Sequence, residues 1–126
     1  MSVVLDAWAI VALLKGERAG PRVRTVMADE DAVMSSINLG EAYYILARDF
    51  EESRVHDTVH ELRRQVRVLD PDFELVLCAA GIKARRPVSY ADAFCVATGM
   101  RHGAGVWTGD PEIIALADLV EVVDLR

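Results

Sequence analysis

The chain has 126 residues, the size of one ordinary domain, so we expect a single domain that spans residues 1–126. Its composition, 52% hydrophobic and 27% charged, is typical of a globular protein, and the longest apolar run, residues 7–14, is far shorter than the roughly 20 residues of a membrane span. Asp6 interrupts the place where the apolar region of a signal peptide would lie, so we expect a cytoplasmic protein without membrane association. The formal net charge of -6 disfavours nucleic-acid binding through overall charge alone, although a site for divalent cations must itself be acidic.

Short apolar runs alternate with segments of helical length along the chain. In chain order the pattern begins with a strand at residues 2–6, a helix at 7–16 and an amphipathic segment at 17–29. A strand at 32–36 is followed by helices at 38–50 and 51–65, and a strand at 66–70 is followed by helices at 71–86 and 89–100. The chain ends with a strand at 103–110, a short helix at 111–118 and a strand at 120–125. This alternation predicts an α/β fold with a central, mostly parallel five-stranded sheet and helices on both faces. Ligands of such sheets bind at the carboxyl ends of the strands.

Two distant segments share one pattern, in which a capping residue precedes an acid by three places. Asn38 stands before Glu41, and Ser89 stands before Asp92. The spacing is that of a capping box, in which the acid accepts a hydrogen bond from the backbone N–H of the capping residue. Helix capping alone is therefore one interpretation of both acids.

Asp6 and Asp110 also have a capping interpretation, because each stands between an expected strand and an expected helix. All four acids nevertheless lie where the expected sheet has its carboxyl edge, since Glu41 and Asp92 open helices that begin at this edge. Four carboxylates at one edge repel one another unless a cation is present. Hard oxygen ligands select Mg²⁺ or Mn²⁺, and such a site can hydrolyse a phosphodiester without a protein nucleophile.

The same residues resemble a known family. The stretches VVLDAWAIVALLKGE, SSINLGEAYYIL, SYADAFCVAT and WTGDPE look like the four acidic blocks of PIN-domain ribonucleases, and their spacing is similar to that of VapC-type toxins of bacterial toxin-antitoxin pairs. The resemblance covers the chain from Val3 to the terminal run 120–125. It implies a single PIN domain that hydrolyses RNA as an endoribonuclease with Mg²⁺ or Mn²⁺. It further implies a cognate antitoxin that wraps the toxin and occupies its acidic groove, frequent homodimers, and toxin-antitoxin hetero-oligomers.

The resemblance also implies a role for each acid. Asp6 and Asp92 match the acids that bind the metal most directly. Glu41 matches the acid that completes the site and orients or activates the water, and Asp110 matches the fourth acid, which often acts through water. We therefore expect all four to be catalytic and metal-binding.

Three further positions are of interest beside these acids. Thr108 matches a hydroxyl residue of the family, although threonine is also common at strand ends. Glu112 is a possible auxiliary acid, and an acid in the first turn of a helix also complements the helix dipole. Trp8 departs from the family, which commonly has Ser or Thr at this position; we expect its ring to pack in the core, with stacking on a nucleobase as the alternative.

Other functions fit the sequence less well. His56 and His60 have the spacing of a zinc protease, but their helix is polar and charged, which indicates a solvated face. A phosphate-transfer enzyme would show a second acid at position 8, which is Trp, and a receiver domain needs a late Lys, whereas none follows Lys83. The remaining alternative is a non-catalytic, toxin-like binding module whose acidic groove captures a basic partner segment.

Overall fold

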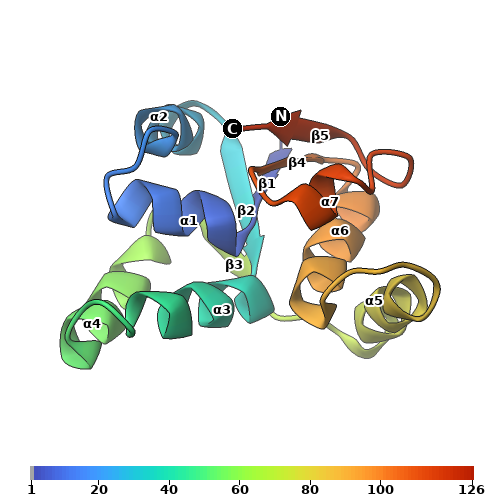
Figure 1. The fold of residues 1–126 in the computed structure, drawn as a ribbon, viewed down its shortest axis with the longest axis horizontal. Coiled ribbons are helices and arrows are strands. Elements are labelled where there is room, and N and C mark those ends of the chain that lie inside the picture. The colour runs from blue at the N-terminus through green and yellow to red at the C-terminus, as the bar shows by residue number, and fades with distance from the viewer. Residues whose placement is uncertain (1) are drawn as a thin grey trace.

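The computed structural model describes residues 2–126 and shows a five-stranded sheet between two layers of helices (Figure 1). The strand order is β3-β2-β1-β4-β5, and all four neighbouring pairs are parallel. The strands are β1 (Ser2–Leu5), β2 (Asp31–Ser35), β3 (Arg67–Leu69), β4 (Gly105–Thr108) and β5 (Val122–Asp124). The helices are α1 (Ala7–Leu14), α2 (Gly20–Asp29), α3 (Ser36–Leu46), α4 (Glu52–Leu62), α5 (Phe73–Arg85), α6 (Tyr90–His102) and α7 (Pro111–Ile114). The predicted α/β fold is confirmed.

The central strand β1 divides the apolar core into two parts. Val3 and Leu5 point toward the layer of α1 to α4, and Val4 points toward the layer of α5 to α7, as expected from the alternation of side chains along a strand. Figure 1 shows these two layers, blue to green on one side of the sheet and yellow to red on the other. A strand buried on both faces reads as a continuous apolar run, which explains why SVVL shows no polar alternation.

Several helix boundaries differ from the prediction. The helix α3 begins at Ser36 and is capped by Ser35, so the expectation that Asn38 caps this helix is wrong. Asn38 already lies in the first turn, fully buried, because Ser35 at the end of β2 supplies the cap. Similarly, α5 begins at Phe73 after the cap Asp72. Pro71 therefore precedes this helix instead of opening it, which corrects the sequence interpretation.

The parallel register brings distant segments to one edge of the sheet. β1 ends at Leu5, which pairs with Trp107 of β4, so the residues that follow these two strands lie side by side. Helix α6 immediately precedes β4, so its amino end lies at the carboxyl edge of the sheet, where α3 also begins. The fold therefore positions four chain segments around one edge. Within residues 2–126, no helix has the length and apolar character needed to span a membrane.

Candidate metal-binding active site

Asp6 and Asp110 each cap a helix, as their sequence contexts predict. An Asp6 oxygen accepts a hydrogen bond from the backbone N–H of Ala9, 2.9 Å away, at the start of α1. An Asp110 oxygen accepts one from the backbone N–H of Glu112, also at 2.9 Å, at the start of α7. Each cap uses one carboxylate oxygen in this way, so capping leaves the second oxygen of each acid for other partners.

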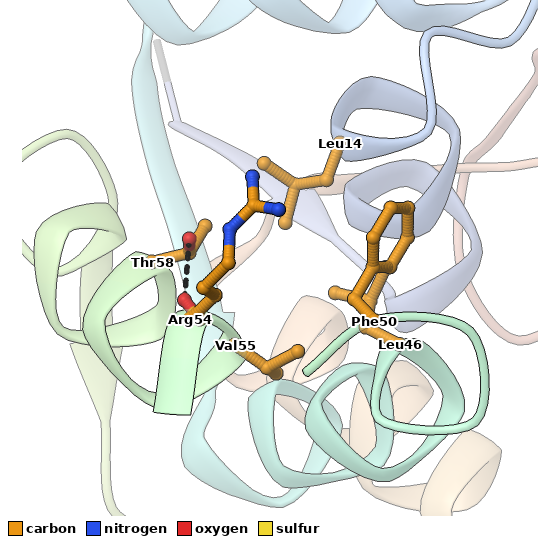
Figure 2. Close-up of a pocket in the computed structure, with 6 residues that line it drawn as sticks. All are labelled: Leu14, Leu46, Phe50, Arg54, Val55 and Thr58. Atoms are coloured by element: carbon orange, nitrogen blue, oxygen red, sulfur yellow. Dashed lines mark hydrogen bonds between the residues drawn. The ribbon is translucent and has the colours of Figure 1, made fainter. Parts of the chain in front are cut away.

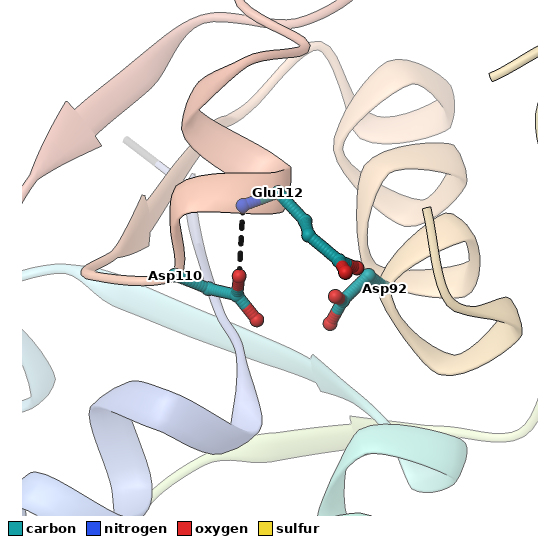
Figure 3. Close-up of side chains that lie close together, drawn as sticks. All are labelled: Asp92, Asp110 and Glu112. Carbon is teal, nitrogen blue, oxygen red and sulfur yellow. Dashed lines mark hydrogen bonds between the residues drawn. The ribbon is translucent and has the colours of Figure 1, made fainter. Parts of the chain in front are cut away.

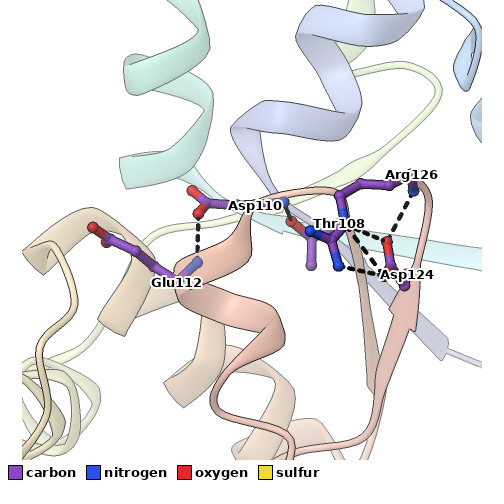
Figure 4. Close-up of polar contacts among 5 residues, drawn as sticks. All are labelled: Thr108, Asp110, Glu112, Asp124 and Arg126. Atoms are coloured by element: carbon purple, nitrogen blue, oxygen red, sulfur yellow. Dashed lines mark hydrogen bonds and ion pairs between the residues drawn. The ribbon is translucent and has the colours of Figure 1, made fainter.

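Thr108 connects these two acids. Its buried hydroxyl donates to the second oxygen of Asp6. The same hydroxyl accepts from the backbone N–H of Asp110 at 2.9 Å (Figure 4). The same residue accepts at its backbone oxygen from the N–H of Leu125, 2.8 Å away, which holds the carboxyl end of β4 in place. Thr108 therefore fixes the orientation of Asp6 relative to Asp110 across two strands.

Helix α6 is capped by Ser89, whose hydroxyl accepts from the backbone N–H of Asp92 at 3.1 Å. The second half of the expected capping box is missing, because the backbone N–H of Ser89 donates to Glu112 at 3.1 Å rather than to Asp92. The Asp92 carboxylate interacts with the Ser89 side chain and lies near Asp110 and Glu112 (Figure 3). One carboxylate oxygen from each of these three acids lies within 4.8 Å of the others.

Glu41 approaches the acids from α3. The neighbouring Asn38 side chain donates to the backbone oxygen of Ala91 at 2.8 Å, which ties the first turn of α3 to the first turn of α6. The Glu41 oxygen Oε1 is buried and has no hydrogen-bond partner among residues 2–126. Since buried polar atoms normally have a partner, this oxygen indicates a missing ligand.

One pocket of about 230 Å³ brings the four predicted acids together. Its lining consists of Asp6, Ala7, Trp8, Val11, Glu17, Glu41, Ile45, Asp92 and Asp110. Sequence reasoning missed Glu17, because a polar residue just after a helix has no feature that distinguishes it from an ordinary surface acid. Trp8 packs against the core, as expected, but it also forms part of the pocket wall.

Burial without a cation raises the pKa of three acids in this pocket. Desolvation, reinforced by the charges of Asp110 and Glu41, raises the pKa of Asp6 to about 7, although the Thr108 and Ala9 hydrogen bonds oppose the shift. Burial together with the charge of Asp110 raises the pKa of Asp92 to about 8. Burial is also the main cause of the raised pKa of Glu41. Such shifts are concentrated at functional sites.

A second pocket of about 150 Å³ lies between α1, α3 and α4 (Figure 2). It is lined by Leu14, Leu46, Phe50, Arg54, Val55 and Thr58 and contains no acid. His56 and His60 lie on α4 nearby, with ring centroids 4.6 Å apart, and both side chains are exposed. The solvated face that the sequence indicates for these histidines is confirmed.

A family model described as the PIN domain matches residues 3–119. This chain belongs to the PIN-domain family. Nuclease activity is general in this family. A search of curated proteins finds no match.

Solved structures share the fold of this PIN domain along nearly its whole length. One is a chain of DNA-bound VapBC from Salmonella typhimurium, with TM-score 0.79 and 18% identity over 100% of this chain and 99% of that chain. Another is VapC20 from Mycobacterium tuberculosis, a sarcin-ricin loop cleaving toxin, with TM-score 0.76 and 22% identity over 90% and 94% of the two chains. A third is a chain of a toxin-antitoxin complex from Klebsiella pneumoniae, with TM-score 0.73 and 14% identity over 98% of both chains.

The donor set of this PIN domain suits a hard divalent cation. All the converging groups are carboxylates, and oxygen ligands of this kind suit Mg²⁺ and Mn²⁺. A bound cation would offset the burial, and with it the smaller repulsion between the acids, that raises the pKa values of Asp6 and Asp92, and would give the buried Glu41 oxygen a polar environment. The residues present therefore fit the metal that the resemblance implies.

Proposed function

We propose that this PIN domain is a metal-dependent endoribonuclease that acts as the toxin of a toxin-antitoxin pair. The observation that carries the proposal is the convergence of Asp6, Glu41, Asp92 and Asp110 on one pocket of a PIN domain. Helix capping explains why individual acids occur at helix starts, but it does not explain why buried carboxylates face one another at a cost in free energy.

In this proposal Asp6 and Asp92 hold Mg²⁺ or Mn²⁺ most directly, and Glu41 and Asp110 complete the site. A divalent cation supplies two things to phosphodiester hydrolysis: it lowers the pKa of a water molecule and it stabilises charge on the phosphate oxygens. The protein orients the carboxylates that would bind the cation. Thr108 and Ala9 hold both oxygens of Asp6 in fixed directions, so this acid is preorganised for its ligand.

Two glutamates have different parts in the proposed reaction. The Oε1 atom of Glu41, which no donor among residues 2–126 occupies, would accept a hydrogen bond from the attacking water and so orient it toward the phosphate. Glu112, through its hydrogen bond to the Ser89 N–H, fixes the start of α6 and so the position of Asp92. Thr108 and Glu112 are therefore auxiliary residues that position the acids.

The toxin role draws support from the solved structures that share this fold. They include a sarcin-ricin loop cleaving toxin and a toxin-antitoxin complex. We infer a similar assembly here, in which a cognate antitoxin occupies the acidic pocket of a hetero-oligomer that also contains the toxin as a homodimer. Because we infer an RNA substrate, we also infer a cytoplasmic location.

The test uses purified protein free of any partner, incubated with structured RNA in the presence and absence of Mg²⁺ or Mn²⁺. We expect cleavage only with metal, and we expect Asp92→Asn to reduce the rate more than about 100-fold, because a neutral amide is a poor ligand for a hard cation. The matched control is Asp57→Asn on the exposed face of α4, which should cleave like the wild type.

Cleavage without metal, or equal cleavage by Asp92→Asn and the wild type, would show that the four acids are not the catalytic centre. If no RNA is cleaved but a basic partner segment binds and Asp92→Asn weakens that binding, the non-catalytic binding module is the correct function instead.

A further inference from the structure

Trp8 stands in the first turn of α1, two residues after Asp6. Its side chain is half-buried and lines the same pocket as the four acids. Val11, one helical turn further, and Ile45 of α3 lie in the same lining. The acidic pocket therefore has an apolar, aromatic wall beside its carboxylates.

The ring of Trp8 is fitted to Gly109, the residue between Thr108 and Asp110. A Cβ atom added to Gly109 would lie 2.2 Å from Cζ2 of Trp8, 2.4 Å from Cε2 and 2.5 Å from Cη2. Any larger residue at this position would displace the indole, so the ring rests directly on the backbone that leads from β4 to α7. This contact places the ring against the backbone beside Asp110, while the ring also packs against the core.

The indole N–H of Trp8 differs from that of a core tryptophan. A buried tryptophan N–H normally finds an acceptor. The N–H of Trp8 has no acceptor among residues 2–126, and it is not among the buried polar atoms that lack one, so it remains in contact with solvent. The edge of the ring is therefore in contact with solvent, and Trp8 reaches the surface of the pocket instead of being enclosed by the core.

We propose that Trp8 determines substrate specificity by stacking on an unpaired nucleobase next to the scissile phosphate. The inference rests on the proposed nuclease function. An aromatic ring can stack on any base, because every base has a π-face. Because bases inside a duplex already stack on one another, the protein should prefer single-stranded or looped RNA at the cleavage site.

A binding measurement tests the stacking separately from catalysis. The chain has two tryptophans, so in a Trp107→Phe variant the fluorescence comes from Trp8 alone. The probe is a short unpaired RNA analogue with methylphosphonate linkages, which resists hydrolysis and lacks the charge that the acids repel. We expect saturable quenching by this probe and none by a matched analogue in which the bases are replaced by abasic sites. Equal quenching by both analogues, or no quenching, overturns the inference.

A kinetic measurement tests the effect on cleavage. Trp8→Leu keeps an apolar side chain but cannot stack, so we expect KM for unpaired RNA to rise about tenfold with kcat nearly unchanged. Trp8→Phe should recover much of the loss, and Trp107→Leu is the control, since Trp107 lines a different groove. A Trp8→Leu variant that unfolds at a lower temperature yet keeps its KM shows that the ring only packs.

These outcomes separate the inference from the proposed function. If the protein cleaves RNA but shows neither fluorescence quenching nor a change in KM, the nuclease function is supported and the stacking role of Trp8 is rejected. Quenching by the base-bearing probe, in protein that cleaves no RNA with any metal, removes the nuclease and leaves Trp8 as a base-binding residue only.

Discussion

At the scale of single residues, the buried carboxylates make the stability of the metal-free protein depend on pH. Asp6 and Asp92 have pKa values of about 7 and about 8 in the folded chain, against 3.8 for an ordinary aspartate. The folded state keeps these protons to a higher pH than the unfolded state. The associated stability is therefore complete below about pH 4 and is lost as the pH rises through 7 and 8.

We predict that the free energy of unfolding, measured by urea denaturation in EDTA, falls by a few kcal/mol between pH 5 and pH 8, since one pKa unit corresponds to about 1.4 kcal/mol. The surface acids whose pKa values are lowered by arginines, such as Asp31 and Asp118, change the stability only at lower pH. Asp92→Asn should be more stable than the wild type at pH 8 and should show a weaker pH dependence. A wild-type stability that rises over this interval contradicts the prediction.

The sequence predicted which acids converge but not which contacts position them. The spacing of Ser89 and Asp92 is that of a capping box, yet the Ser89 N–H is bound by Glu112 from another helix. No local pattern encodes this contact, because it depends on how α7 packs beside α6. The roles of Asp6, Glu41, Asp92 and Asp110 stay predictions until activity is measured.

At the scale of elements, the position of Asp92 depends on how closely α6 packs on the sheet. Gly99 makes this approach possible, because a Cβ atom there would lie 2.9 Å from Val120 Cγ2, 3.0 Å from Val106 Cγ2 and 3.1 Å from the Ala104 oxygen. Val106 belongs to β4, Ala104 lies just before this strand, and Val120 lies just before β5; all three are buried, so they have little room to move.

We predict that Gly99→Ala lowers the free energy of unfolding by about 1–3 kcal/mol through overpacking. The matched control is Gly81→Ala in α5, where the nearest atom is the end of the flexible Arg85 side chain at 3.3 Å. That change should stabilise the protein by about 0.5–1 kcal/mol, because alanine favours the helix. Thermal unfolding of both variants checks the prediction, and a stable Gly99→Ala variant would show that α6 packs more loosely.

The order of the elements was predictable because apolar strands and helical segments alternate clearly, whereas their boundaries were not. Residues 32–36 read as a strand and residues 38–50 as a helix, but β2 ends at Ser35, which also caps α3. Strand end and helix cap are thus the same residue, a transition without a loop. A short-range pattern contains no signal for this, since Asn38 is an equally good capping residue by type.

At the scale of the whole molecule, the formal net charge of -6 bears on every experiment with cations. Added salt screens repulsion among acids over the whole surface, so any salt can stabilise this protein to some extent. A cation site in the acidic pocket predicts a more specific effect. It requires divalent cations to act beyond their contribution to ionic strength, and it requires this additional effect to depend on the pocket acids.

We therefore predict that Mg²⁺ or Mn²⁺ raises the unfolding temperature at pH 8 more than NaCl does at equal ionic strength. At 100 times the dissociation constant, a cation that binds only the folded state adds about 2.7 kcal/mol to the free energy of unfolding. The gain should vanish in Asp92→Asn and persist in Asp57→Asn, which removes the same charge from the exposed face of α4. It should also shrink toward pH 5, where protons compete for the carboxylates of Asp6 and Asp92. Equal shifts with Mg²⁺ and NaCl, or an undiminished shift in Asp92→Asn, would mean that cations act on the surface charge of the molecule and not in the pocket.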